Sequence, residues 1–201
     1  MGAASEEERV GDDLVSLGWT DDSLPLHRHV CFYYADERTM RRSLSFIRVG
    51  LEIPGDFCMI LSDSSRHPVL LDLLRDGYPG DIDEHLRTGK LELVDGALTT
   101  GELAAAVGAS FDRALARGQR RIRALVFLAW GWPGWPDAMA LRQFEAAVNE
   151  LVVRYPAVIV CTYCVPNLPG EVLLESGLGN HPIVMIDDLI VADSPFYRRH
   201  L

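Results

Sequence analysis

The sequence predicts an α/β fold in which a mostly parallel sheet lies between two layers of helices, forming a three-layer sandwich. Several short runs are continuously apolar, as expected of strands that are buried on both faces. Runs with apolar residues at helical spacing separate these strands, which is the pattern of βαβ units. Of the 201 residues, 48 % are apolar and 24 % are charged, which is ordinary for a globular protein.

The chain is expected to contain an acidic disordered tail over residues 1–13 and a single domain over residues 14–201. A lead-in without sustained periodicity precedes the first strand, "HVCFYY", at residues 29–34. The other expected strands are residues 57–61, 91–95, 121–130, 157–163, 182–187 and 189–193.

Helices are expected between most of these strands. Asp36 and Asp137 are predicted N-caps, because each precedes a run with apolar residues at helical spacing. The expected helices are residues 36–52, 67–77, 99–118, 137–155 and 168–180.

Charge and composition exclude several classes of protein. The formal net charge of −10 argues against nucleic acid as a partner, since phosphate binding requires basic surfaces. No apolar run is long enough to span a membrane, so no membrane partner is expected. The four cysteines lie in or beside apolar runs, which is typical of reduced, buried thiols in a cytoplasmic protein.

Aromatic side chains gather where the expected strands end. In parallel sheets ligands bind beyond the carboxyl ends of the strands. Glu145 lies at the edge of the apolar stripe of a predicted helix. It is either a solvated carboxylate or one that points inward and reaches the carboxyl end of the strand expected at residues 121–130. No G-x-x-x-x-G-K-[ST] phosphate loop follows any strand. The predicted ligand contacts are therefore Tyr33, Trp130, Trp132, Glu145 and Tyr163.

The residue types for a zinc site are also present, in Cys161-x-x-Cys164, His29, Cys31 and His181. Residues three apart on a strand point to opposite faces, so Cys161 and Cys164 are not expected to bind the same metal ion. We therefore favour reduced core thiols, and predict neither a metal nor another cofactor.

His29 and Cys31 are interpreted as structural, because they lie toward the amino end of their strand. Convergence of His29, Glu145, Cys161 and His181 around one cavity would instead favour a site, and their dispersal would favour independent structural roles.

The order of several motifs, from His29 to Tyr197, resembles the MEDS family, the methanogen/methylotroph sensory domain. The segments that carry the resemblance are "HVCFYY", "FIRVGLEIPGDFCMIL", "LVFLAWGW", "FEAAVNELV", "VIVCTYC" and "HPIVMIDDLIVADSPFY". Cys164 stands where the family often has Asp, and Ser194 where Asn is common. The resemblance implies a RecA/KaiC-like fold that lacks the Walker A loop. It also places Tyr197 in the family's closing motif, as a structural or site residue.

The resemblance implies a sensory role, and three functions stay open. The leading hypothesis is a non-enzymatic domain that binds a small organic ligand and transmits its state to a signalling partner, with a homodimer left open. The second is an interaction scaffold with a degenerate ATPase-like fold. The third is an enzyme with a Cys/His/Glu site, which could depend on zinc.

Overall fold

The computed structural model describes residues 14–96, 99–128 and 137–198. Its centre is a seven-stranded sheet with the order β5-β4-β6-β7-β3-β8-β9, in which only β9 runs antiparallel to its neighbour. The strands are β3 (Arg28–Tyr34), β4 (Asp56–Ser62), β5 (Leu91–Asp95), β6 (Arg121–Phe127), β7 (Ala157–Cys164), β8 (Ile183–Ile186) and β9 (Leu189–Ala192).

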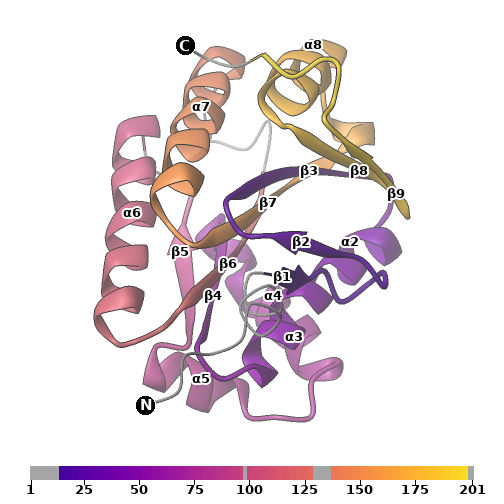
Figure 1. The fold of residues 1–201 in the computed structure, drawn as a ribbon. Coiled ribbons are helices and arrows are strands. Elements are labelled where there is room, and N and C mark those ends of the chain that lie inside the picture. The colour runs from indigo at the N-terminus through magenta and orange to yellow at the C-terminus, as the bar shows by residue number, and fades with distance from the viewer. Residues whose placement is uncertain (1–13, 97–98, 129–136, 199–201) are drawn as a thin grey trace.

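Helices cover both faces of this sheet (Figure 1). One face carries α2 (Glu37–Ser43), α3 (Ser45–Glu52), α4 (His67–Asp76) and α5 (Ile82–Thr88). The other carries α6 (Thr100–Ala116), α7 (Ala138–Arg154), α8 (Gly170–Val172) and the π-helix η3 (Leu173–Leu178). Two short 3-10 turns, η1 (Ser64–Arg66) and η2 (Val165–Asn167), follow β4 and β7. The predicted α/β class with a mostly parallel, helix-flanked sheet is therefore confirmed.

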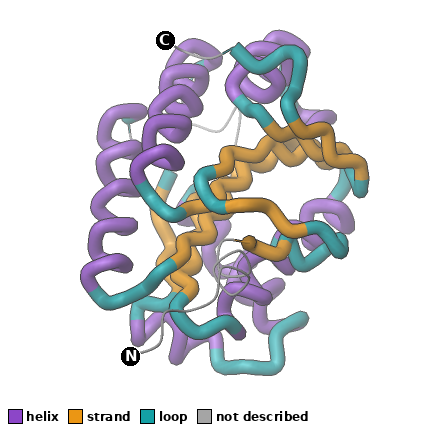
Figure 2. The backbone as a smooth tube through the Cα atoms, viewed as in Figure 1, coloured by secondary structure: helices purple, strands orange, loops and turns teal. Residues whose placement is uncertain are grey.

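Figure 2 shows helices on either side of the strands, and each face of the sheet has its own hydrophobic core. Strand residues alternate between these cores, because successive side chains point to opposite faces. On β3, Cys31 and Tyr33 face α6 and α7, whereas Phe32 and Tyr34 face α2 to α4. Side chains can therefore contact one another only when they point to the same face of the sheet.

Two local features differ from the sequence prediction. The helix expected over residues 36–52 is two helices that meet at Leu44, where the Leu44 N–H bonds to the Arg41 carbonyl and the Ser43 hydroxyl to the Met40 carbonyl. The lead-in contains a small antiparallel hairpin, β1 (Leu14–Ser16) and β2 (Ser23–Pro25). Strands of three residues are too short to show a period. The tail predicted over residues 1–13 lies outside the described residues.

A buried ion pair ties this hairpin to the sheet. Asp56 on β4 accepts hydrogen bonds from Arg121 Nε at 2.6 Å and from Arg123 Nε at 2.7 Å, both on β6. Arg123 also donates to the carbonyls of Ser16, at 2.6 Å, and Phe46. Asp56 and Arg123 are both fully buried, so each charge is balanced inside the core.

None of the helices in the described part of the chain has both the length and the apolar character that crossing a bilayer requires.

Candidate functional site

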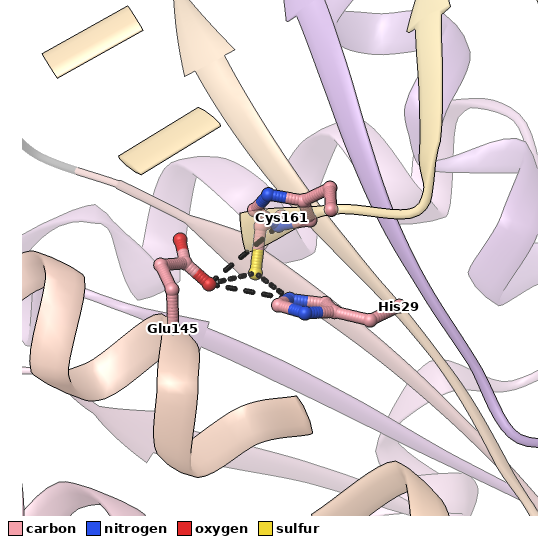
Figure 3. Close-up of side chains that lie close together, drawn as sticks. His29, Glu145 and Cys161 are labelled. Carbon is pink, nitrogen blue, oxygen red and sulfur yellow. Dashed lines mark hydrogen bonds and ion pairs between the residues drawn. The ribbon is translucent and has the colours of Figure 1, made fainter. Parts of the chain in front are cut away.

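Four polar side chains meet inside the core between the sheet and α7. His29 comes from β3, Cys161 from β7, Glu145 from α7 and His181 from the residues just before β8. One nitrogen, sulfur or oxygen atom of each lies within 4.8 Å of the corresponding atom of the others. All four residues are fully buried. Figure 3 shows His29, Glu145 and Cys161 pointing toward one another.

The parallel pairing of β3 and β7 brings two of the four together. Cys31 is the partner of Cys161 in the register, and His29 is the partner of Ile159. His29 and Cys161 therefore project from the same face of neighbouring strands, two positions apart. The helix α7 lies against this face and buries Glu145, which is the inward orientation considered for this carboxylate.

The contacts within the cluster are short. His29 Nε2 lies 3.3 Å from Cys161 Sγ and 3.2 Å from Glu145 Oε2. Cys161 Sγ lies 3.3 Å from Glu145 Oε2. His181 Nε2 is 3.6 Å from the same carboxylate oxygen, and the two imidazole rings are 3.9 Å apart between centroids. The arrangement is a compact set of four potential metal ligands.

Neighbouring groups fix the orientation of both imidazoles. Asn149, one turn after Glu145 on α7, donates its amide N–H groups to the carbonyls of Glu145 and Asn180. Its oxygen is thus the acceptor for His29 Nδ1, at 3.1 Å. The π-helix places the Gly177 carbonyl 2.6 Å from His181 Nδ1. Each Nδ1 is therefore the protonated nitrogen, and each Nε2 offers a lone pair to the cluster.

Burial controls the protonation of the imidazoles. Burial lowers the pKa of both His29 and His181 to about 3, although the hydrogen bond that His29 donates to Asn149 raises the His29 pKa in part. Both imidazoles are neutral near neutral pH, which is the form that binds metals. Because the His29 imidazole is neutral, its 3.2 Å contact with Glu145 is not an ion pair.

Burial also raises the pKa of the Glu145 carboxyl and of the Cys161 thiol. Glu145 Oε1 accepts a 2.5 Å hydrogen bond from the Tyr163 hydroxyl, which leaves Oε2 for the cluster. A thiol with a raised pKa is a poor nucleophile, because the thiolate is the reactive form. The raised pKa therefore disfavours nucleophilic catalysis by Cys161.

A second feature lies at the carboxyl ends of the strands, on the other face of the sheet. A cavity of about 680 Å³ opens where β3, β4, β6 and β7 end. Its lining combines apolar side chains with a few polar ones: Tyr34, Ala35, Asp36, Glu37, Met40, Ser65, Arg66, Val69, Leu73, Leu128, Cys164, Pro166, Asn167 and Leu168. This is the edge at which the sequence predicted ligand binding.

The predicted ligand contacts lie in different places. Tyr33 and Tyr163 belong to the core on the α7 face, where the Tyr33 hydroxyl donates to the Leu173 carbonyl and their rings are 5.6 Å apart. Their strand neighbours Tyr34 and Cys164 line the cavity instead. Trp130 and Trp132 lie outside the described residues.

Three further residues from the prediction are placed as follows. Cys31 is buried beside Cys161, on the same face as the cluster. Cys164 lies on the opposite face from Cys161, as the strand period requires. Tyr197 is half-buried near the carboxyl terminus, where its N–H bonds to the Ser194 carbonyl.

Asn149 was not recognised from the sequence as a functional residue. Its signal is the four-residue spacing from Glu145, which places both on one face of α7. The sequence alone does not show that Asn149 points toward the cluster, because this residue lies at the edge of the apolar stripe of the helix.

Residues 28–182 match the model of the family described as the MEthanogen/methylotroph, DcmR Sensory domain. The match runs from the first residue of β3 to the residue before β8, and so includes all four residues of the cluster and every strand that borders the cavity. Among curated proteins no significant match was found.

Proposed function

The chain belongs to the MEDS family of sensory domains, and on that premise we propose that it is a non-enzymatic sensor of a small organic molecule. The ligand would bind in the cavity at the carboxyl ends of β3, β4, β6 and β7 and change how the domain contacts a signalling partner. The observation that carries the proposal is the position of this cavity in the sheet.

The cavity lies in the crevice where parallel sheets bind ligands. After β4 the chain passes to the α4 face, and after the neighbouring β6 it passes to the α7 face. Strands that diverge in this way leave a crevice between their carboxyl ends. The volume of about 680 Å³ is within the range of roughly 300–1,000 Å³ that small-molecule sites occupy.

The lining indicates the class of ligand. Met40, Leu73 and Leu128 supply apolar surface, whereas Tyr34 and Arg66 bring a hydroxyl and a guanidinium. An apolar wall with few polar groups binds the body of an organic molecule and orients its polar end. We therefore favour a small organic compound that carries one polar or anionic group.

Transmission to a partner would use α2. This helix lines the cavity through Met40, and its Arg42 forms an ion pair with Asp188 in the turn between β8 and β9. Ile186 and Leu189, which flank this turn, are exposed apolar residues. A ligand that displaces α2 would therefore alter an apolar surface that a partner protein could contact.

The sealed cluster supports a non-enzymatic role. Its four side chains are fully buried, so a substrate would have to enter the core to reach Cys161 or Glu145. The raised pKa of the Cys161 thiol also disfavours nucleophilic attack at neutral pH.

The first prediction concerns ligand binding by the full chain. Thermal unfolding should be followed against a panel of short organic acids, alcohols and nucleotides. A ligand at about 100 times its dissociation constant adds about 2.7 kcal/mol to the free energy of unfolding, which raises Tm by about 5–10 °C. Val69→Trp, which adds bulk at the cavity wall on α4, should abolish this rise.

Val153→Trp is the matched control, because Val153 is another exposed valine, on α7 and away from the cavity. It should retain the full rise in Tm. The proposal is wrong if no compound of the panel raises the Tm of the wild-type chain, or if Val69→Trp responds as the wild type does.

A further inference from the structure

The buried cluster has the dimensions of a tetrahedral metal centre. With Zn–N and Zn–O bonds of about 2.0–2.1 Å and a Zn–S bond of about 2.3 Å, tetrahedral ligands lie about 3.3–3.6 Å apart. The separations that link His29, Glu145 and Cys161 are 3.2 to 3.3 Å, and that between His181 and Glu145 is 3.6 Å. Four of the six separations are thus already those of ligands, and all six are within 4.8 Å.

Each ligand but the thiol is held by a second group. His29 Nδ1 donates to Asn149, His181 Nδ1 donates to the Gly177 carbonyl, and Tyr163 donates to the outer oxygen of Glu145. Metal-binding histidines almost always donate their other N–H in this way, which fixes the ring and makes the inner nitrogen a better ligand. The surroundings orient three lone pairs toward one point.

Hydrogen bonding alone leaves the cluster unsatisfied. His29 Nε2, His181 Nε2 and Glu145 Oε2 are all acceptors that face the centre, and Cys161 brings a single S–H donor. His181 Nε2 is buried and finds no hydrogen-bond partner among the described residues. A buried nitrogen lone pair without a partner is costly, and a cation at the centre would satisfy all the acceptors together.

We propose that His29, Glu145, Cys161 and His181 form a closed, four-coordinate zinc site. On binding, the Cys161 thiol gives its proton to solvent, and Zn²⁺ takes the place of that proton between the thiolate, the Glu145 carboxylate and the two imidazoles. A thiolate with two imidazoles favours Zn²⁺ over the oxygen-preferring Mg²⁺ and Ca²⁺. The site lies on the α7 face of the sheet, so it is separate from the cavity proposed for the organic ligand.

Such a site would join four parts of the chain. Its ligands come from β3, α7, β7 and the segment between η3 and β8. With four protein ligands and no exposed position, the centre is closed, as structural zinc sites are. The zinc would act as a cross-link that stabilises the folded domain, and not as a site of catalysis.

Cobalt substitution tests the proposal directly. The full chain, reduced and stripped of metal by a chelator, is titrated with Co²⁺ and followed by absorbance. Saturation at one Co²⁺ per chain is expected, with the intense visible bands of tetrahedral cobalt and a near-ultraviolet thiolate charge-transfer band. Zn²⁺ should remove both signals, and one equivalent of Zn²⁺ should raise the Tm of the stripped protein.

Variants identify the ligands. Cys161→Ser should lose the thiolate band, whereas Cys58→Ser should retain it, because Cys58 is an equally buried cysteine in the other core. Asn149→Ala keeps all four ligands but frees His29, and should weaken Zn²⁺ affinity about 10–100-fold. If circular dichroism shows that Cys161→Ser does not fold, the Zn²⁺ affinity of Asn149→Ala tests the site instead.

Two results would overturn the proposal. One is a folded wild-type chain that shows no thiolate band with stoichiometric Co²⁺, which would leave the cluster as a hydrogen-bonded part of the core. The other is a thiolate band that persists in Cys161→Ser, which would place the metal on another cysteine.

Discussion

At Asp56 one buried carboxylate balances two arginines, and its removal gives the second prediction. Asp56→Ala would leave the Arg123 guanidinium buried without a counter-charge, although its hydrogen bonds to the Ser16 and Phe46 carbonyls remain. Breaking a buried pair in this way costs about 3–5 kcal/mol of unfolding free energy, which urea titration measures.

Asp72→Ala is the matched control, since Asp72 forms an exposed pair with Arg75 within α4. Its loss should cost less than about 1 kcal/mol. Equal losses for the two variants would show that burial does not control the strength of the Asp56 pair.

The candidate site shows what single residues reveal before the fold is known. The residue types of the cluster were recognised, and Glu145 was considered as an inward carboxylate. Their meeting was not predicted, because it depends on the register of β3 against β7 and on where α7 crosses them. His29 lies near the amino end of β3, yet its side chain still reaches Cys161 on the neighbouring strand.

At the scale of elements, the third prediction concerns Gly50 in α3. A Cβ atom at this position would overlap the Arg123 side chain and stand 2.6 Å from Cys58 Sγ. Gly50→Ala should therefore lower the free energy of unfolding by about 1–3 kcal/mol, despite the higher helix propensity of alanine. Chemical denaturation of the purified variant measures this change.

Gly101→Ala in α6 provides the comparison, because a Cβ atom there has no described atom within 4 Å. This variant should be neutral or gain up to about 1 kcal/mol. If both alanine variants were equally stable, close packing of α3 against β6 would not explain the glycine.

Most elements could be predicted from periodicity and caps. Asp36 and Asp137 do accept hydrogen bonds from the N–H groups of Thr39 and Ala140, as the N-cap prediction required. The break at Leu44 and the β1–β2 hairpin were missed, because they depend on local hydrogen bonds and on docking to the core. The change from α8 to a π-helix has no sequence signal comparable to a cap.

At the scale of the whole molecule, the sheet order gives the fourth prediction. The strands β4, β6, β7, β3 and β8 have hydrogen-bonded partners on both sides, whereas β5 and β9 have one each and β1–β2 form a separate pair. Hydrogen exchange should find the slowest amides in the five inner strands. Opening free energies for β9 and the hairpin should lie several kcal/mol lower.

Uniform exchange rates across the sheet would contradict this gradient. Such a result would mean that the described sheet opens only by global unfolding, with no separate loss of its edge.

The cluster between α7 and the strands β3 and β7 also constrains the order in which the chain can fold. During synthesis His29 emerges first and His181 last, with Glu145 and Cys161 between them. A nascent chain that ends before residue 181 cannot complete the group, however well its earlier strands have paired. Contacts between such distant segments form slowly. Completion of this polar centre therefore requires that the segment before the last parallel strand, β8, has docked on the sheet.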